Sequence, residues 1–131
     1  MIVDASALVA IVFQEPESDR FAEAIATAAR ARIAAPTLLE TAIVVERSER
    51  PHEWKALDRL VAALGLEIEP FTDDHTEIAR DAYRRYGKGH GHPAQLNFGD
   101  CFSYALAKVT GEPLLYTGDD FVHTDIRSAL T

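Results

Sequence analysis

The sequence is poor in cysteine and in long apolar runs. Cys101 is the single cysteine, so the chain cannot form an internal disulfide, which is typical of a protein of the reducing cytoplasm. We expect Cys101 to be a small, buried apolar residue. The apolar runs of the chain, such as residues 34–39 and 43–45, are far shorter than the roughly 20 residues that cross a membrane. No membrane span is expected, and no secretory signal either, because no basic segment precedes residue 2.

Positive charge is scarce as well. Lys and Arg number 13 against 21 Asp and Glu, which gives a formal net charge of −8. Passive binding to nucleic-acid phosphates depends on Lys and Arg, so the composition disfavours that class of protein. It does not exclude a nuclease, because an excess of carboxylates can hold divalent cations that reverse the local charge. An acidic surface is also compatible with a basic partner.

What the sequence does contain is an alternation of short apolar segments and helical periodicity. Its 131 residues are 47% apolar and fit one domain spanning residues 1–131. Strands are expected at residues 2–3, 32–35, 66–70 and 114–117. Helical patterns lie between them, which predicts parallel βαβ units with right-handed crossovers. The expected fold is α/β, with a parallel central sheet flanked by helices on both faces.

Two of the expected helices carry buried carboxylates. The helix after the second strand begins near Thr37, is evenly apolar, and has Glu40 in its first turn. The helix over residues 99–109 follows the cap Asn97 and has Asp100 in its first turn, with Ser103 and Tyr104 on the same face. A carboxylate facing a core is costly to bury unless it is paired or binds a metal. No Lys or Arg lies within four residues of Asp100, so local ion pairing does not explain it.

The acidic residues of interest share one location. Each lies near the carboxyl end of an expected strand, the edge of a parallel sheet where ligands bind; they are Asp4, Glu40, Asp100, Asp119 and Asp120. Converging carboxylates repel one another unless a cation lies among them, and Mg²⁺ or Mn²⁺ is the natural partner of oxygen ligands. Such a site would support phosphodiester hydrolysis. The alternative is a set of unrelated helix caps and surface acids, since Asp and Glu are favoured in first turns.

Four sequence motifs resemble those of PIN-domain proteins, and closely those of the VapC-type toxins of bacterial type II toxin–antitoxin modules. They are residues 2–8 (IVDASAL), 38–40 (LLE), 97–107 (NFGDCFSYALA) and 114–121 (LLYTGDDF), and residues 83–89 (YRRYGKG) are also similar. The resemblance runs from end to end of the chain. It implies a PIN-like domain, an endoribonuclease that needs Mg²⁺ or Mn²⁺ and inhibits translation, a homodimer, and neutralisation by a cognate VapB-type antitoxin in a heterotetramer or larger assembly.

Carried over residue by residue, the family's acidic cluster falls on Asp4, Glu40 and Asp100, with Asp4 and Asp100 as direct metal ligands. The fourth acid is open, because Asp119 and Asp120 are adjacent where many PIN domains separate the two acids by one residue. Ser6 matches the small hydroxyl residue that often supports the first Asp, although it also suits a helix start.

Three further features have alternative interpretations. Arg84, Arg85 and Lys88 could bind RNA phosphates beside the cluster, or lie in a solvated loop. His90 and His92 suggest a metal site, but no third ligand lies at zinc-like spacing. An apolar helical stripe is one candidate dimer interface, formed by Trp54, Leu57, Val61 and Leu64.

Two other functions compete with the nuclease. A receiver-like phosphoacceptor domain also places acids at strand ends, but it needs paired acids after the first strand, where Asp4 stands alone. A PIN-like scaffold that binds a partner without cleaving RNA is the other alternative, and it is compatible with intact acidic residues.

Overall fold

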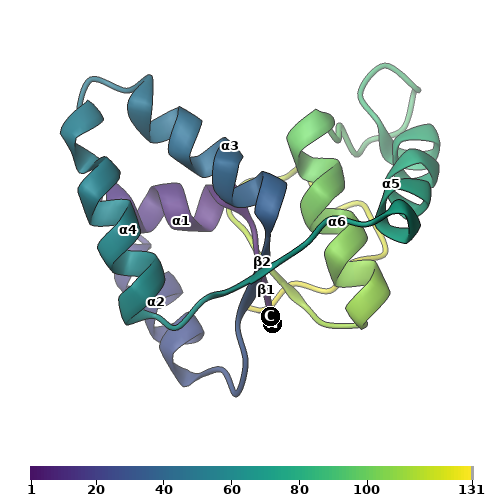
Figure 1. The fold of residues 1–131 in the computed structure, drawn as a ribbon. Helices are drawn as coiled ribbons and strands as arrows, with labels where there is room; N and C mark the ends of the chain where they lie inside the picture. Colours follow the sequence, from purple (N-terminus) through teal and green to yellow (C-terminus); the bar gives the residue numbers. More distant parts are fainter. Residues whose placement is uncertain (131) are drawn as a thin grey trace.

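The computed structural model describes residues 1–130 and places a small parallel sheet between two groups of helices (Figure 1). In chain order the elements are β1 (Ile2–Val3), α1 (Ala5–Val12), α2 (Ser18–Thr27), β2 (Arg32–Ala34), α3 (Ala35–Glu46), the short 3₁₀ helix η1 (Pro51–Glu53), α4 (Trp54–Ala63), β3 (Glu67–Glu69), α5 (Asp73–Tyr86), α6 (Phe98–Thr110) and β4 (Leu114–Leu115). The strands are ordered β3-β2-β1-β4, and every pair is parallel. The expected α/β fold is confirmed.

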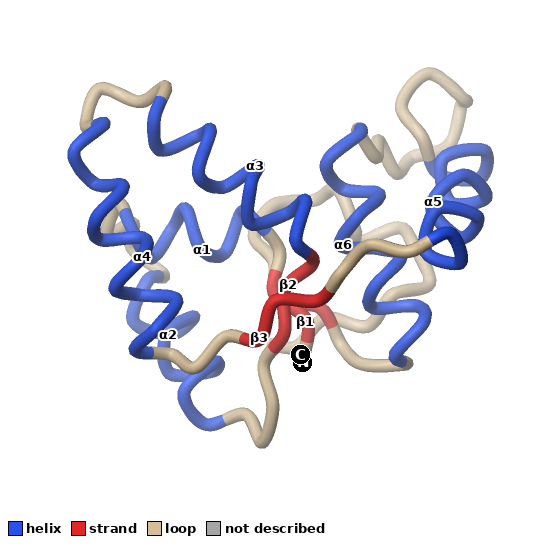
Figure 2. Tube along the Cα trace, in the orientation of Figure 1, coloured by secondary structure: helices blue, strands red, loops and turns tan. Residues whose placement is uncertain are grey.

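The two faces of the sheet carry separate apolar cores. Successive side chains of a strand point to opposite faces, and β1 shows this with Val3 in one core and Ile2 in the other. The core around Val3 is closed by α1, α2, α3 and α4, and the core around Ile2 by α5 and α6. Figure 2 shows the strands, in red, running between these two groups of helices. Helices therefore flank both faces, as expected.

The parallel register brings the carboxyl ends of the strands to one edge. Val3 pairs with Leu115 across β1 and β4, and Ile2 pairs with Arg32 across β1 and β2. Asp4, the first residues of α3 and the chain after β4 therefore emerge side by side. This is the edge at which open α/β sheets bind ligands.

Capping interactions fix where the helices next to this edge begin. Asp4 is the N-cap of α1 and accepts a hydrogen bond from the backbone of Ser6. At α6, Asn97 and Asp100 form a reciprocal capping box. The helix ends at Gly111, whose φ of 71° lies in the left-handed region that glycine adopts without strain.

The structure corrects several expected boundaries. β4 ends at Leu115 rather than residue 117, and α3 begins at Ala35, with a proline in its first turn. Glu40 consequently lies in the second turn of α3 instead of the first. Although α3 is evenly apolar, it is not buried all round: its apolar residues cover more than the face that meets the core, and Leu39, Ile43 and Val44 are exposed.

Of the helical stripe considered as one candidate dimer interface, only Trp54 is largely exposed, at 45%. Leu57 is only 3% exposed, and Val61 and Leu64 pack against the same core. The periodicity of α4 reflects its packing onto its own domain. Among residues 1–130, no helix is both long and apolar enough to cross a membrane.

Candidate active site

Asp4 is held by hydroxyl groups from two different elements. Its side chain is 4% exposed, and its Oδ2 accepts hydrogen bonds from the backbone N–H of Ser6 at 3.0 Å and from the Ser6 hydroxyl at 2.7 Å. Its Oδ1 accepts a hydrogen bond from the buried Ser103 hydroxyl of α6 at 2.5 Å. Ser6 therefore both starts a helix and supports the first Asp. Sequence reasoning placed Ser103 on the face of Asp100 but missed its bond to Asp4.

The buried hydroxyls connect Asp4 to its neighbours on both sides. Ser103 Oγ lies 3.5 Å from the Oγ1 of Thr37 in α3, and the backbone N–H of Thr117 donates to the Ser6 hydroxyl at 3.1 Å. The first Asp is thus oriented by α1, α6 and the segment after β4. A carboxylate fixed by several donors keeps one geometry, which a ligand of a metal ion requires.

Asp100 lies on the same α6 face as Ser103 and is only 8% exposed. Its Oδ2 accepts the backbone N–H of Asn97 at 3.0 Å, so the capping interpretation holds for one oxygen. Within residues 1–130, no protein donor contacts the other oxygen. Burial is the main cause that raises the pKa of Asp100 from its ordinary 3.8 to about 7; the Asn97 hydrogen bond opposes this, and the charges of Asp4, Asp120 and Glu40 add to it.

Glu40 reaches the cluster across the start of α6 because Gly99 has no side chain. A Cβ added at Gly99 would lie 2.6 Å from the Glu40 Cδ, far inside van der Waals contact. The carboxylate therefore lies directly over the residue that precedes Asp100. Burial raises the pKa of Glu40, and the charge of Asp4 raises it further.

Asp119 and Asp120 are both exposed in the turn after β4. The charge of Asp120 is among the causes that raise the pKa of Asp100, so Asp120 is electrostatically coupled to the cluster. This favours Asp120 as the fourth acid, a choice that the sequence left open.

Among residues 1–130, no cationic side chain neutralises these acids. In the described part of the chain, none of the ion pairs involves Asp4, Glu40, Asp100, Asp119 or Asp120. Within residues 1–130, no three His, Cys, Asp or Glu side chains are grouped closely enough to hold a metal ion.

The two arginines at the end of α5 share one acid. Arg84 and Arg85 each pair with Asp81 at 3.5 Å, and Arg85 also lies over the Tyr86 ring and donates to its hydroxyl at 2.8 Å. Lys88 follows in the loop and is exposed.

The two loop histidines make local contacts. The His90 ring packs edge-on against Tyr83, and the His92 ring packs edge-on against Tyr86. His92 also accepts the backbone N–H of Ala94 at 3.0 Å. These interactions order the turn, and the pair stays without a third metal ligand in the described residues.

The comparison with known families decides the identity of the fold. The model of the PIN domain matches residues 1–126. The chain belongs to the PIN-domain family. The relatives of this PIN domain include Ribonuclease VapC42 of Mycobacterium tuberculosis, 49% identical over 131 residues and covering 100% of both chains. Ribonuclease VapC28 of the same species is 45% identical over 130 residues, covering 99% of this chain and 98% of the relative. The resemblance to VapC-type proteins is confirmed, and the receiver-like alternative is wrong.

Solved structures agree on the fold. The crystal structure of Mycobacterium tuberculosis VapC20, a sarcin–ricin loop cleaving toxin, superposes with a TM-score of 0.77 at 17% identity, covering 95% of each chain. Rickettsia felis VapBC2, bound to a DNA fragment from its promoter, gives a TM-score of 0.70 at 14% identity, covering 97% of this chain and 94% of that one. At these identities the likeness extends to the fold alone.

Proposed function

We propose that this PIN domain is a Mg²⁺- or Mn²⁺-dependent endoribonuclease, the toxin of a type II toxin–antitoxin module that inhibits translation in the cytoplasm. The observation that carries the proposal is a pair of buried carboxylates, Asp4 and Asp100, at the ligand-binding edge of the sheet, with no ion pair to either among residues 1–130. The names of the full-length VapC relatives support the reaction class. A PIN-like scaffold without turnover is the alternative that the experiment below tests.

The donor set fits a hard divalent cation. Every candidate ligand is a carboxylate oxygen, which Mg²⁺ and Mn²⁺ prefer. Asp4 and Asp100 would bind the ion directly, while Glu40 and Asp120 would contribute charge around it. The ion would supply Lewis acidity and neutralise charge that develops on the scissile phosphate.

The chain itself supplies the orientation. Ser6 and Ser103 fix both oxygens of Asp4, and the Asn97 backbone fixes one oxygen of Asp100. The second Asp100 oxygen, which accepts no hydrogen bond from residues 1–130, would bind the ion. Two carboxylates held in this way can offer their oxygens to an ion without reorganising during the reaction.

The direct test is cleavage of total bacterial RNA by the purified protein. Millimolar Mg²⁺ or Mn²⁺ should produce new, discrete RNA ends in a sequencing library, and excess EDTA should suppress them. A preparation that leaves RNA intact with both metals would favour the non-cleaving scaffold. Cleavage that is indifferent to EDTA would contradict the carboxylate metal site.

Gly99→Ala should weaken the site through Glu40. The added methyl group would collide with the Glu40 carboxylate, and that flexible side chain would turn away from the cluster. Folding should change little, because Ala is a better helix former than Gly. We expect a drop in cleavage of about tenfold to a hundredfold, the usual cost of losing a supporting group at a metal site, measured beside the melting temperature. The control is Gly99→Ala with Glu40→Gln: if Gly99 acts through Glu40, the double variant should be no worse than Glu40→Gln alone.

The proposed partner is a VapB-type antitoxin, and the α3–α6 surface suits it. A groove of about 390 Å³ lies beside the cluster, with an almost wholly apolar lining in which Glu40 is the one acid. Its residues are Pro36, Leu39, Glu40, Ile43, Val44, Phe98, Gly99 and Phe102. An apolar segment of the antitoxin would lie in this groove and direct an Arg or Lys at the acids, where a guanidinium binds carboxylates in a bidentate fork. The VapBC2 complex supports this class of partner.

If that basic residue competes with the metal, inhibition by the antitoxin should weaken as Mg²⁺ rises. Replacing the one basic side chain with Ala should restore cleavage while much of the apolar affinity survives, as measured by calorimetry. Inhibition that is unaffected by metal concentration would mean that the antitoxin blocks RNA access elsewhere. We also propose a homodimer, assembling with the antitoxin into a heterotetramer or larger complex.

A further inference from the structure

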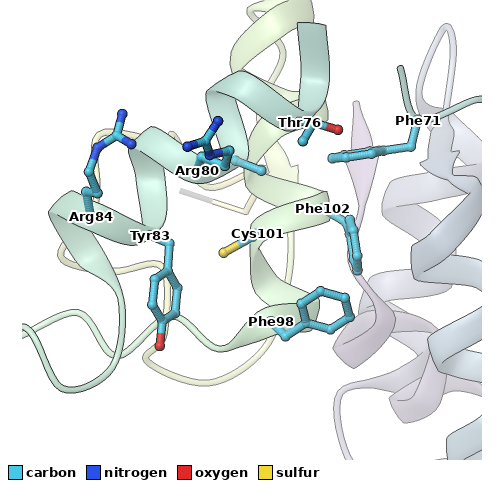
Figure 3. Close-up of a pocket in the computed structure, with 9 residues that line it drawn as sticks. Phe71, Thr76, Arg80, Tyr83, Arg84, Phe98, Cys101 and Phe102 are labelled. Carbon is cyan, nitrogen blue, oxygen red and sulfur yellow. The ribbon is translucent and has the colours of Figure 1, made fainter. Parts of the chain in front are cut away.

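A second, aromatic groove lies between α5 and α6, on the other side of Phe98 from the α3–α6 groove. Its volume is about 700 Å³, within the range of sites for small organic groups. Figure 3 shows the Cys101 sulfur pointing into this space, with Tyr83 and Phe98 below it and Phe102 and Phe71 to one side. The remaining lining residues are Thr76, Ala79, Arg80 and Arg84.

Phe98 is the most exposed of these rings. It is the first residue of α6 and is 79% exposed, an unfavourable position for so large an apolar side chain in water. Its ring centroid lies 4.8 Å from that of Phe102 in an edge-on arrangement, and Phe102 meets Phe71 edge-on at 5.0 Å. This chain of contacts holds the Phe98 ring in place while leaving most of it open to a ligand.

Two cations border this mostly apolar groove in an acidic protein. They are Arg80 and Arg84, one turn apart on α5, and Figure 3 shows their guanidinium groups pointing away from Cys101 and Phe98. Each is held only by an exposed ion pair, Arg80 to Glu77 at 3.2 Å and Arg84 to Asp81 at 3.5 Å. Such exposed pairs contribute little, so an incoming phosphate can displace them.

The groove adjoins the acidic cluster. Phe98 immediately precedes Gly99, which lies under the Glu40 carboxylate, and Cys101 at the floor follows Asp100. Phe98 and Phe102 also line the groove that contains Glu40. An RNA strand with one phosphate at the acidic cluster would therefore have a neighbouring nucleotide at the Phe98 ring.

We propose that the α5–α6 groove is a nucleobase subsite for single-stranded RNA. A base flanking the scissile phosphate stacks on Phe98 beside Tyr83, and Arg80 and Arg84 bind the adjoining backbone phosphates. Stacking on aromatic rings with basic contacts to the backbone is the general mode of single-strand recognition. The inference rests on the proposed ribonuclease function. Exposed cations beside an aromatic lining without acids suit a stacked base with its phosphate backbone, and this favours single-stranded RNA as the occupant.

The test measures binding and turnover separately. Fluorescence anisotropy in EDTA would follow binding of labelled single-stranded RNA octamers, one for each homopolymer and one of mixed sequence. Phe98→Ala should weaken binding about tenfold to a hundredfold, as expected for one lost base stack, whereas Phe98→Trp should keep it. Arg80→Gln and Arg84→Gln should each lower the affinity and reduce the slope of log K against log salt by about 0.7. In Mg²⁺, Phe98→Ala should raise KM by the same factor as it weakens binding.

The matched controls are Val109→Ala, an exposed apolar residue of α6 outside the groove, and Arg20→Gln, which has a comparable exposed pair to Glu17. Both should bind RNA as the parent does. If Phe98→Ala and the Arg variants keep parental affinity and KM, the subsite proposal is wrong while the ribonuclease function stands. If Phe98→Ala instead converts a dimer to a monomer in sedimentation with RNA binding unchanged, the groove is a self-association surface. If the parent neither binds nor cleaves RNA, the proposed function fails, and the subsite with it.

Discussion

Replacing Asp100 with Asn should reduce RNA cleavage by about 10³-fold or more, because the variant loses a charged ligand worth several kcal/mol in the transition state. Folding should survive. The Asn97 backbone N–H can still donate to the side-chain oxygen at position 100, so the cap of α6 is retained. The substitution also removes a buried charge that Asp4, Glu40 and Asp120 repel. The measurement is the cleavage rate of the variant beside its circular dichroism spectrum and melting temperature.

Asp74→Asn is the matched control for this experiment. Asp74 also lies in the first turn of a helix, α5, but it is exposed and away from the cluster. If the acids are only helix caps, the two variants should behave alike. Cleavage by Asp100→Asn within a few-fold of the parent rate under saturating Mg²⁺ would refute its role as a metal ligand.

The second large effect is the dependence of stability on pH and metal. Burial first, and the neighbouring acids after it, raise the pKa of Asp100 to about 7 in the folded, metal-free protein, while the unfolded chain keeps the ordinary 3.8. Between these values the folded state holds a proton that the unfolded state releases. Asp100 therefore does not lower the free energy of unfolding below pH 3.8. Its effect lowers that free energy progressively as pH rises toward 7, and the loss is complete above pH 7.

A bound divalent cation should reverse this loss. At a concentration one hundred times its Kd, a ligand of the native state adds about 2.7 kcal/mol, a shift in Tm on the order of 10 °C for a domain of this size. Below pH 7 the metal must displace the Asp100 proton, so its Kd should tighten about tenfold per pH unit and level off above pH 7. Differential scanning calorimetry and Mn²⁺ titrations from pH 5 to 8 would measure both quantities. Asp100→Asn isolates the effect, because it should flatten the pH slope of the metal-free protein; an equal slope in both proteins would contradict this account.

The fold could be predicted from the sequence where local pattern and packing agree. Ile2 and Val3 alternate between two cores, and the intervening helical periods leave parallel connection as the natural topology. Strand ends could not be predicted as well. Residues 114–117 read as one apolar strand, but beyond Leu115 the chain leaves the ladder, and Thr117 donates to the Ser6 hydroxyl instead. That partner is distant in sequence, so no local pattern reveals it.

The site residues also divide into those that local sequence predicts and those set by contacts between distant segments. Asp4 stands out in sequence because it ends an expected strand, and Glu40 and Asp100 stand out because each interrupts apolar sequence in an expected helix. Sequence does not show that the Glu40 carboxylate lies against Gly99, because that contact depends on how α3 crosses α6. The α4 stripe illustrates a different limit: periodicity shows that Leu57 faces apolar surroundings, but not whether those surroundings belong to its own core or to another chain.

The most direct test of the central claim is the location of Mn²⁺ by anomalous diffraction from crystals of the metal-loaded protein. The account predicts an anomalous peak at the carboxyl edge of the sheet, with an oxygen of Asp4 and an oxygen of Asp100 each about 2.1 Å from it, and Glu40 and Asp120 around it. Saturating Mn²⁺ that binds elsewhere, or leaves Asp4 and Asp100 without contact to the ion, would contradict the account.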